Sequence, residues 1–289
     1  MKIRNLLDKD EFAISFEVFP PKTQINYESV ETATRNIAAL KPEFMSVTYG
    51  AGGGTSEYTV SIAKDLQQRY EIPMMAHLTC ITSTQEKIAN QLSLLRENGI
   101  ENILALRGDI PEGMEEEAKN RSFEHASDLI AEIKKHGDFC IGGACYPEVH
   151  PDSDSQKQDI ENLKKKVDAG CEFLVTQMFF DNNILYNFLY KIREAGISVP
   201  VMPGIMPITN AKQMKRTIKL SGTQLPQRFI RILETFGDSP QAMRQAGIAY
   251  ATEQIIDLYA NGVKKVHVYS MNQPMVAEAI MNNLSDILG

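Results

Sequence analysis

The sequence has few cysteines, and they follow no pattern that would bind a metal ion or build a disulfide framework. Four occur in 289 residues, and no two of them form a CxxC pair. Cys140 and Cys145 are five positions apart, so on a strand their side chains point to opposite faces. We therefore expect reduced, mostly buried thiols in a cytoplasmic protein, because buried free cysteine behaves as a small hydrophobic residue.

Long apolar runs and an excess of positive charge are also missing. No run approaches the roughly 20 apolar residues that span a bilayer, and the first ten residues contain no apolar signal core. The formal net charge is −7, which argues against nucleic acid as the main partner. We expect neither a membrane nor a nucleic acid among the partners of this chain.

What is present is a set of short apolar runs separated by segments with helical spacing. Hydrophobic residues make up 43% and charged residues 23%, as in ordinary globular proteins. Ile88, Leu92 and Leu95 illustrate the helical spacing. The charged stretch 112–119 is predicted to be a mobile loop. Eight strands are predicted, at residues 14–19, 44–48, 74–78, 103–106, 140–145, 173–176, 201–204 and 266–269.

Eight strands alternating with helices predict an α/β fold with a parallel sheet closed into a (βα)8 barrel, the TIM barrel. An open doubly wound sheet is the alternative. The gap between the seventh and eighth strands is long enough for two or three extra helices. No linker rich in Pro, Gly or Ser interrupts the chain, so we expect residues 1–289 to form a single domain.

Polar and glycine residues gather directly after the predicted strands. Barrel enzymes place their chemistry at that rim, because the carboxyl ends of the parallel strands meet there. Scattered surface polarity would not favour these positions so consistently, so the pattern predicts an enzyme. The stretches involved are 17–21, 48–54, 77–79, 107–109, 146–150, 177, 203–204 and 270–272.

Glu17 is unusual because it lies inside an apolar strand, between Phe16 and Val18. Alternation places Phe16 and Val18 on one face and Glu17 on the other. If the first face packs on helices, Glu17 points into the barrel, where loss of solvent raises the pKa of a carboxyl group. Such a group suits a general acid near neutral pH. A carboxylate paired with an interior Arg or Lys is the other interpretation.

Other polar residues at strand ends allow two interpretations each. Asp109 follows Arg107 and Gly108, which fits either close backbone contact with a ligand or a turn closed by a salt bridge. His77 and His150 have no partners at the spacing of a zinc site. They are either structural histidines or donors to a ligand's phosphate or ring.

The glycine-rich stretch 50–54 does not match a nucleotide-binding fingerprint. G-x-G-x-x-G would need glycine at position 55, where Thr55 stands, and no Walker A or G-x-S-x-G sequence occurs. A backbone anion pocket and a flexible loop both remain open for this stretch. Lys164, Lys165 and Lys166 form either a solvated helix face or a phosphate contact near the barrel mouth.

Eight sequence blocks, in order along nearly the whole chain, resemble the methylenetetrahydrofolate reductase family, in the bacterial form that consists of the catalytic barrel only. They are FEVFPP at 16–21, SVTYGA at 46–51, HLTC at 77–80, LRGD at 106–109, YPEVHP at 146–151, LKKKVDAG at 163–170, TQ with FFD at 176–181, and PGIMP at 203–207.

The resemblance implies a (βα)8 barrel that binds FAD without a Rossmann fold. It also implies a ping-pong reaction, in which reduced nicotinamide gives hydride to the flavin, and the flavin then reduces 5,10-methylenetetrahydrofolate to 5-methyltetrahydrofolate, the methyl source for methionine synthesis. By the same resemblance Glu17 protonates N10 of the folate, which opens the methylene bridge to an N5 iminium cation. Asp109 would hold the pterin edge and favour nearby positive charge.

The resemblance also implies binding positions. Thr48 and Gln177 would lie near the nicotinamide, with Gln177 also touching folate, and Gln213 and Gln273 would reach the folate. The FAD contacts would be Thr48, Tyr49, Ala51, His77, Arg107, Gly108, Asp109, Ala126, Tyr146, His150, Asp159, Asn162, Lys165 and Lys166. No metal site is expected.

Three positions depart from the family pattern. Gln273 and Lys165 stand where arginine is common, so the bidentate fork of arginine is missing at both. Thr217 replaces an aromatic ring of some members, which leaves the partner that stacks on the nicotinamide, and the choice between NADH and NADPH, open.

Three other functions fit the sequence less well. A proline-dehydrogenase-like flavin barrel needs no acid for N10, and an aldolase needs a Schiff-base lysine or a metal ion at a strand end. An electron-transferring subunit, active only within a complex, is a further alternative. We expect a homo-oligomer because the barrel rim is apolar.

Overall fold

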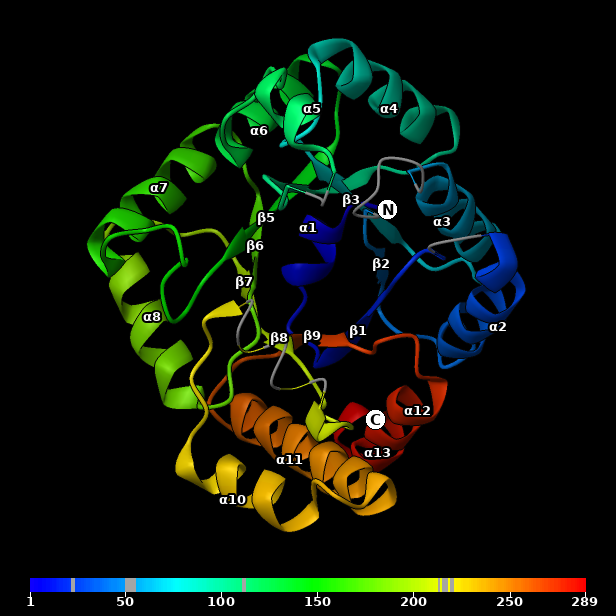
Figure 1. The fold of residues 1–289 in the computed structure, drawn as a ribbon, viewed down its shortest axis with the longest axis vertical. Helices are drawn as coiled ribbons and strands as arrows, with labels where there is room; N and C mark the ends of the chain where they lie inside the picture. The colour runs from blue at the N-terminus through cyan, green and yellow to red at the C-terminus, as the bar shows by residue number, and fades with distance from the viewer. Residues whose placement is uncertain (22–23, 50–55, 111–112, 213, 215–217, 219–220) are drawn as a thin grey trace.

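The computed structural model describes residues 1–21, 24–49, 56–110, 113–212, 214, 218 and 221–289. Their strands form one parallel sheet in the order β7-β6-β5-β4-β3-β2-β1-β9-β8, which curves into a barrel (Figure 1). The strands are β1 (Ala13–Val18), β2 (Met45–Val47), β3 (Met74–Thr79), β4 (Asn102–Leu106), β5 (Cys140–Cys145), β6 (Phe173–Thr176), β7 (Val201–Met202), β8 (Gly204–Ile205) and β9 (Lys265–Tyr269).

The ends of the sheet meet at Pro203. β7 pairs with β6, and β8 pairs with β9. Proline has no backbone N–H to donate to a ladder, so the seventh strand is split into two short pieces, each bonded to one neighbour. Together the pieces act as one strand, and the predicted (βα)8 barrel is confirmed.

The eight predicted strands are all found, and β5 and β6 have the predicted bounds. The four cysteines are free and buried, as expected. One segment was predicted wrongly: residues 115–119, read as part of a loop, form the short helix α5. Three successive glutamates in its first turn favour this helix through its macrodipole.

Helices surround the barrel, and those after β8 supply the extra segments predicted before the last strand (Figure 1). The helices are α1 (Ile3–Leu7), α2 (Tyr27–Ala38), α3 (Ser56–Tyr70), α4 (Gln85–Glu97), α5 (Glu115–Lys119), α6 (Ala126–Lys135), α7 (Gln156–Asp168), α8 (Asn182–Glu194), α10 (Gln227–Phe236), α11 (Pro240–Ala260), α12 (Pro274–Asn283) and α13 (Ser285–Leu288), with a 3-10 turn at Gln24–Asn26. None of the helices in the described part of the chain is long and apolar enough to cross a membrane.

The two faces of the strands pack in different environments. Phe16 and Val18 belong to the large cluster between strands and helices. A second cluster lies inside the barrel at the amino end of the strands, where Ile3 and Leu6 of α1 pack against Phe44 and Phe173. In Figure 1, α1 lies within the ring of strands. One end of the barrel is therefore filled with apolar side chains, which leaves the opposite end for polar ones.

Candidate active site

Glu17 is a buried carboxyl group on the inner face of β1. Its neighbours Phe16 and Val18 pack outward, so strand alternation directs Glu17 into the barrel. The residue is 8% exposed, and burial raises the pKa of its carboxyl group to about 8. Glu17 is therefore protonated at neutral pH. The alternative of a carboxylate paired with an interior Arg or Lys is not observed among the described residues.

His77, on β3, faces Glu17 across the inside of the barrel. The Nε2 atom of His77 lies 3.4 Å from Oε2 of Glu17. Burial lowers the pKa of His77 to about 3, so at neutral pH both groups are uncharged and the contact is not an ion pair. Nε2 is buried and forms no hydrogen bond with the described residues, which leaves a polar atom without a partner beside the acid.

Tyr269, on β9, is a third polar side chain at this level and is partly buried, and sequence reasoning missed it. It pairs with Glu17 in the β1–β9 ladder. Its hydroxyl donates to the carbonyl oxygen of Thr176 at 2.5 Å. Burial, followed by the nearby Glu17, raises the pKa of Tyr269. Alternation along the last strand would have placed Tyr269 inside, but nothing in the sequence linked it to Glu17.

A second polar group, also missed, lies one layer deeper in the barrel. His267 is fully buried, with Nδ1 2.7 Å from Ser15 Oγ and Nε2 2.9 Å from Ser46 Oγ. Ser15 donates its hydroxyl to the carbonyl of Val266, which favours the tautomer in which His267 donates from Nδ1 and accepts from Ser46 at Nε2. Burial lowers the pKa of His267 to about 3. This neutral network supports the layer that carries Glu17.

The loop after β9 holds the backbone around Glu17. The Ser270 hydroxyl donates to the Glu17 carbonyl at 2.6 Å. Asn272 accepts from the N–H of Phe19 and donates to its carbonyl. Met271 and Asn272 both have φ of 52°, a left-handed conformation that is uncommon outside glycine. Gln273 follows and lies 3.4 Å from the Thr209 hydroxyl.

The strand ends of β4 and β5 gather a charged group beside the barrel mouth. Arg107 donates to Asp152 at 2.5 Å, and the ring of Tyr146 lies 4.4 Å from that of His150. Burial, reinforced by Arg107, lowers the pKa of His150. Burial raises the pKa of Tyr146 to about 12. Arg107 therefore has an acidic partner, but that partner is Asp152 and not the adjacent Asp109.

Gly108 and Asp109 complete the turn after β4. Gly108 has φ of +82°, and a Cβ there would lie 2.9 Å from Cβ of Thr79. Only glycine fits that turn without displacing its neighbour. Asp109 is exposed, and its charge contributes to raising the pKa of Tyr146. The turn thus presents an exposed carboxylate close to the Tyr146 ring.

Helix α7, after β5, carries the other predicted basic contacts, and its lysines differ. Lys165 is exposed and donates to Asn162 at 3.0 Å. The Lys166 amine instead reaches back to the Ala144 carbonyl at 2.5 Å, and burial lowers its pKa. Asp159 accepts from the His150 backbone and the Ser153 hydroxyl. Of the two predicted lysines, Lys165 alone extends into solvent.

The remaining predicted positions divide into two sets. Thr48 and Tyr49 follow β2, Gln177 follows β6, and Ala126 begins α6. The Gln177 backbone donates to Cys145 at 2.7 Å, which fixes it beside the end of β5. Ala51, Gln213, Thr217 and the stretch 50–54 lie outside the described residues. In the part of the chain that is described, no three His, Cys, Asp or Glu side chains are grouped to hold a metal ion.

Comparison with known proteins places the sequence in one family. The profile of the methylenetetrahydrofolate reductases matches residues 2–285, nearly the whole chain. This chain belongs to the methylenetetrahydrofolate reductase family. The resemblance of the eight sequence blocks is thereby confirmed, and the shared segments include the strand ends that carry Glu17, Asp109 and Gln177.

Relatives within this reductase family differ in length. Methylenetetrahydrofolate reductase (NADH) 1 of Arabidopsis thaliana is 38% identical over 98% of this chain, which spans 50% of the plant protein. The 5,10-methylenetetrahydrofolate reductase of Escherichia coli is 36% identical over 94% of this chain and 90% of the bacterial protein. The chain thus spans about half the length of the plant relative and most of the bacterial one.

The fold also has a counterpart among solved structures. An uncharacterized protein from Clostridium thermocellum that binds two copies of 5-methyl-5,6,7,8-tetrahydrofolic acid has a TM-score of 0.67 to this reductase family member. The match covers 100% of this chain and 99% of that one at 14% sequence identity. At this identity the similarity concerns the barrel fold alone.

Proposed function

We propose that this protein reduces 5,10-methylenetetrahydrofolate to 5-methyltetrahydrofolate, with reduced nicotinamide as the electron donor and FAD as the bound cofactor. The observation that carries the proposal is Glu17, a carboxyl group that burial keeps protonated at the barrel mouth. Family membership supports the substrate, and the plant relatives named as NADH enzymes favour NADH.

The residues at the mouth fit a flavin nucleotide. His77 Nε2 is a buried polar atom without a hydrogen bond to the described residues, as expected where a bound group completes the site. Arg107 and Lys165 offer cations to phosphates, and Tyr146 and His150 offer ring faces. We propose that Asp109, Asp159, Asn162, Ala126 and Lys166 are further FAD contacts, with Thr48, Tyr49 and Gln177 at the neighbouring strand ends.

FAD bound at this mouth would supply hydride transfer from the nicotinamide to the folate. The protein's own contribution is the proton. The methylene bridge between N5 and N10 accepts hydride poorly, and proton transfer from Glu17 to N10 breaks the bond between N10 and the methylene carbon. An N5 iminium cation results, which is a good hydride acceptor. Glu17 becomes a carboxylate and regains a proton from solvent.

The environment of Glu17 suits both retention of the proton before the reaction and its release to the folate. Burial holds the proton at pH 7, and a pKa of about 8, near the working pH, suits a general acid that transfers this proton to N10 as the bond to the methylene carbon breaks. Tyr269 and His77 are uncharged neighbours that leave the carboxyl group neutral. The exposed Asp109 would hold the pterin edge and favour the cation that forms next to it.

Measuring the two half-reactions separately distinguishes the role of Glu17 from that of the rest of the site. In stopped-flow experiments on the purified flavoprotein, Glu17→Gln should leave reduction of the flavin by NADH within about twofold of the wild type. Its folate half-reaction should fall by about 10²- to 10⁴-fold, the usual contribution of a general acid. Glu132→Gln, at a carboxylate on α6 that is 6% exposed, is the matched control and should leave both rates unchanged.

Two outcomes would contradict the proposal. Equal loss of both half-reactions in Glu17→Gln would indicate a structural role for Glu17. A purified chain that binds flavin but reduces no folate with NADH would favour an electron-transferring subunit instead. The homo-oligomer expected from the sequence stays a prediction, to be checked by light scattering.

A further inference from the structure

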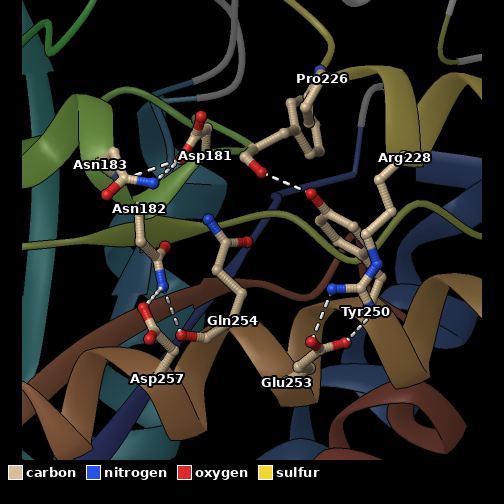
Figure 2. A pocket seen from close by; sticks show the side chains of 10 residues that line it. Asp181, Asn182, Asn183, Pro226, Arg228, Tyr250, Glu253, Gln254 and Asp257 are labelled. Atoms are coloured by element: carbon tan, nitrogen blue, oxygen red, sulfur yellow. Dashed lines mark hydrogen bonds and ion pairs between the residues drawn. The ribbon is translucent and has the colours of Figure 1, made fainter.

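A pocket of about 320 Å³ lies outside the barrel mouth, between the start of α8 and the helices α10 and α11. Its size is at the lower end of the range usual for small-molecule sites. Figure 2 shows its wall, with Asp181 and Asn182 at the start of α8 on one side and Arg228 and Tyr250 on the other. None of these residues takes part in the reaction proposed above.

The charges that line the pocket are mostly negative. Asp181, Glu253 and Asp257 contribute three carboxylates, against the one guanidinium of Arg228. Arg228 is engaged, because it forms a two-pronged ion pair with Glu253 and its guanidinium carbon lies 5.6 Å from the Tyr250 ring centre. Among the described lining residues, no cation is left to pair with Asp181 or Asp257.

The start of α8 does not reverse this balance. A helix amino terminus carries about half a positive charge, whereas the Asp181 carboxylate carries a full negative one. One oxygen of Asp181 accepts from the backbone and the side chain of Asn183. The second oxygen accepts no hydrogen bond from the described residues and is free for a donor.

An independent feature also calls for a donor. Asn182 is 9% exposed and lines the pocket, and its Oδ1 atom has no hydrogen-bond partner among the described residues. Its Nδ2 atom is fixed, because it donates to Asp257 and to the Gln254 carbonyl. The amide therefore cannot turn over to satisfy the oxygen. In Figure 2 the side chains of Asn182 and Gln254 lie between Asp181 and Asp257.

The geometry points to a binding site for a primary alkylammonium ion. We propose that this pocket binds such an ion, with the ammonium group donating to Asp181 Oδ2 and Asn182 Oδ1 and the alkyl chain packing on Phe180, Pro226 and Tyr250. An ammonium group has three donors and no acceptor, which matches a pocket that offers acceptors. The lining carboxylates are not grouped as metal ligands, and this spacing favours an organic cation.

Two side chains of the pocket are hydrogen-bonded to the backbone that follows β6 of the barrel. Tyr250 donates to the Phe180 carbonyl at 2.5 Å, and Gln254 donates to the Phe179 carbonyl at 2.9 Å. Both side chains line the pocket, and the backbone they hold is the segment that follows Gln177. The site is therefore built on the outer side of a loop whose inner end reaches the proposed active site.

The test is a titration of the ¹⁵N-labelled full chain, purified with its flavin, with n-butylammonium chloride. Saturable shifts of the Asn182 and Gln254 side-chain amide signals are expected. Tetramethylammonium has the charge but no donor, and 1-butanol has the chain but no charge, so neither should give saturable shifts there. These probes separate the proposed recognition from general attraction of cations and from simple filling of an apolar space.

The matched variants are Asp181→Asn and Asp128→Asn. Asparagine caps a helix as well as aspartate does, so Asp181→Asn removes the charge and keeps α8. It should raise the dissociation constant for n-butylammonium about tenfold, as expected for loss of one charge-assisted hydrogen bond. Asp128→Asn makes the same change at the start of α6 and should have no effect.

Several results would overturn the proposal. They are no saturable shift with n-butylammonium, equal shifts with 1-butanol or tetramethylammonium, and an unchanged dissociation constant in Asp181→Asn. The titration does not measure folate reduction, so its failure would leave the proposed reaction untouched.

Discussion

Glu17 and Tyr269 are paired residues in the ladder between the first and last strands of the barrel, where Glu17 is buried and Tyr269 is partly buried. The charge of an ionised Glu17 would further raise the pKa of Tyr269, so the two groups stay protonated together at neutral pH. The barrel mouth therefore holds a proton that it can transfer. None of the described residues places a cation beside Glu17 that would favour its ionised form.

The first prediction concerns the pH dependence of the folate half-reaction. If protonated Glu17 is the acid, its rate constant is level below pH 8 and falls tenfold per pH unit well above the pKa of about 8. Stopped-flow traces between pH 6 and pH 10 measure this. A rate constant that rises with pH over this range would exclude Glu17 as the proton donor.

The same pKa predicts how Glu17 affects stability. The folded state holds the proton more tightly than the unfolded state, whose pKa is near 4.5. Stability is therefore fully present below pH 4.5 and is lost as the pH rises toward 8, by up to about 3 kcal/mol at pH 7. Glu17→Gln cannot ionise, so it should be more stable than the wild type at pH 7, with a smaller difference at pH 5. Urea unfolding at both pH values measures the two differences, and a less stable variant at pH 7 would contradict the expectation.

The opposite dependence of stability on pH is expected for His267. Its pKa of about 3 in the folded state lies below the unfolded value near 6.5, so the unfolded state takes up the proton first as the pH falls. The wild type should lose about 2 kcal/mol through this group between pH 7 and pH 5. His267→Gln can still donate to Ser15 and accept from Ser46, but it does not titrate. The variant should therefore lose less stability than the wild type between pH 7 and pH 5. Urea unfolding at pH 7 and pH 5 measures the change in the free energy of unfolding, and an equal change in both proteins would show that His267 does not contribute.

A further prediction concerns Gly204, where the seventh strand passes Tyr269. A Cβ at this position would lie 2.2 Å from the Tyr269 hydroxyl and 2.4 Å from the Thr176 carbonyl oxygen. Gly204→Ala should therefore destabilise the protein by about 2–4 kcal/mol, because backbone cannot move aside cheaply. Gly113→Ala is the control, since its Cβ would meet nothing within 4 Å although φ is +83°. It should cost only about 1 kcal/mol, the cost of its left-handed φ. Urea unfolding distinguishes the two, and equal losses would mean that the contact at Gly204 does not matter.

Much of the fold could be predicted from the sequence, because each strand carries its own apolar run and turn residues. The inward direction of Glu17 followed from alternation along one strand alone. Tyr269 and His267 could not be connected with it in the same way, since their partners lie about 250 positions away on β1. Pairing at that distance depends on closure of the barrel, which no local pattern encodes.

Lysine side chains show a second limit. Lys165 and Lys166 are adjacent in a charge run, yet one amine extends into solvent and the other folds back onto the Ala144 carbonyl. A long flexible side chain chooses between such partners according to the surface beneath it. The sequence predicted the helix that carries both lysines and could not predict which of them faces β5.

The split at Pro203 gives the cylinder a seam. Only two residue pairs join β6 to β7, and two join β8 to β9, compared with five between β1 and β9. Tyr269 crosses this seam, because it sits on β9 and donates to Thr176 on β6. The backbone amides beside Pro203 should therefore exchange with deuterium earlier than those of β3 and β4. The Tyr269 side chain, which lies beside Glu17, would then also hold the two sides of this seam together.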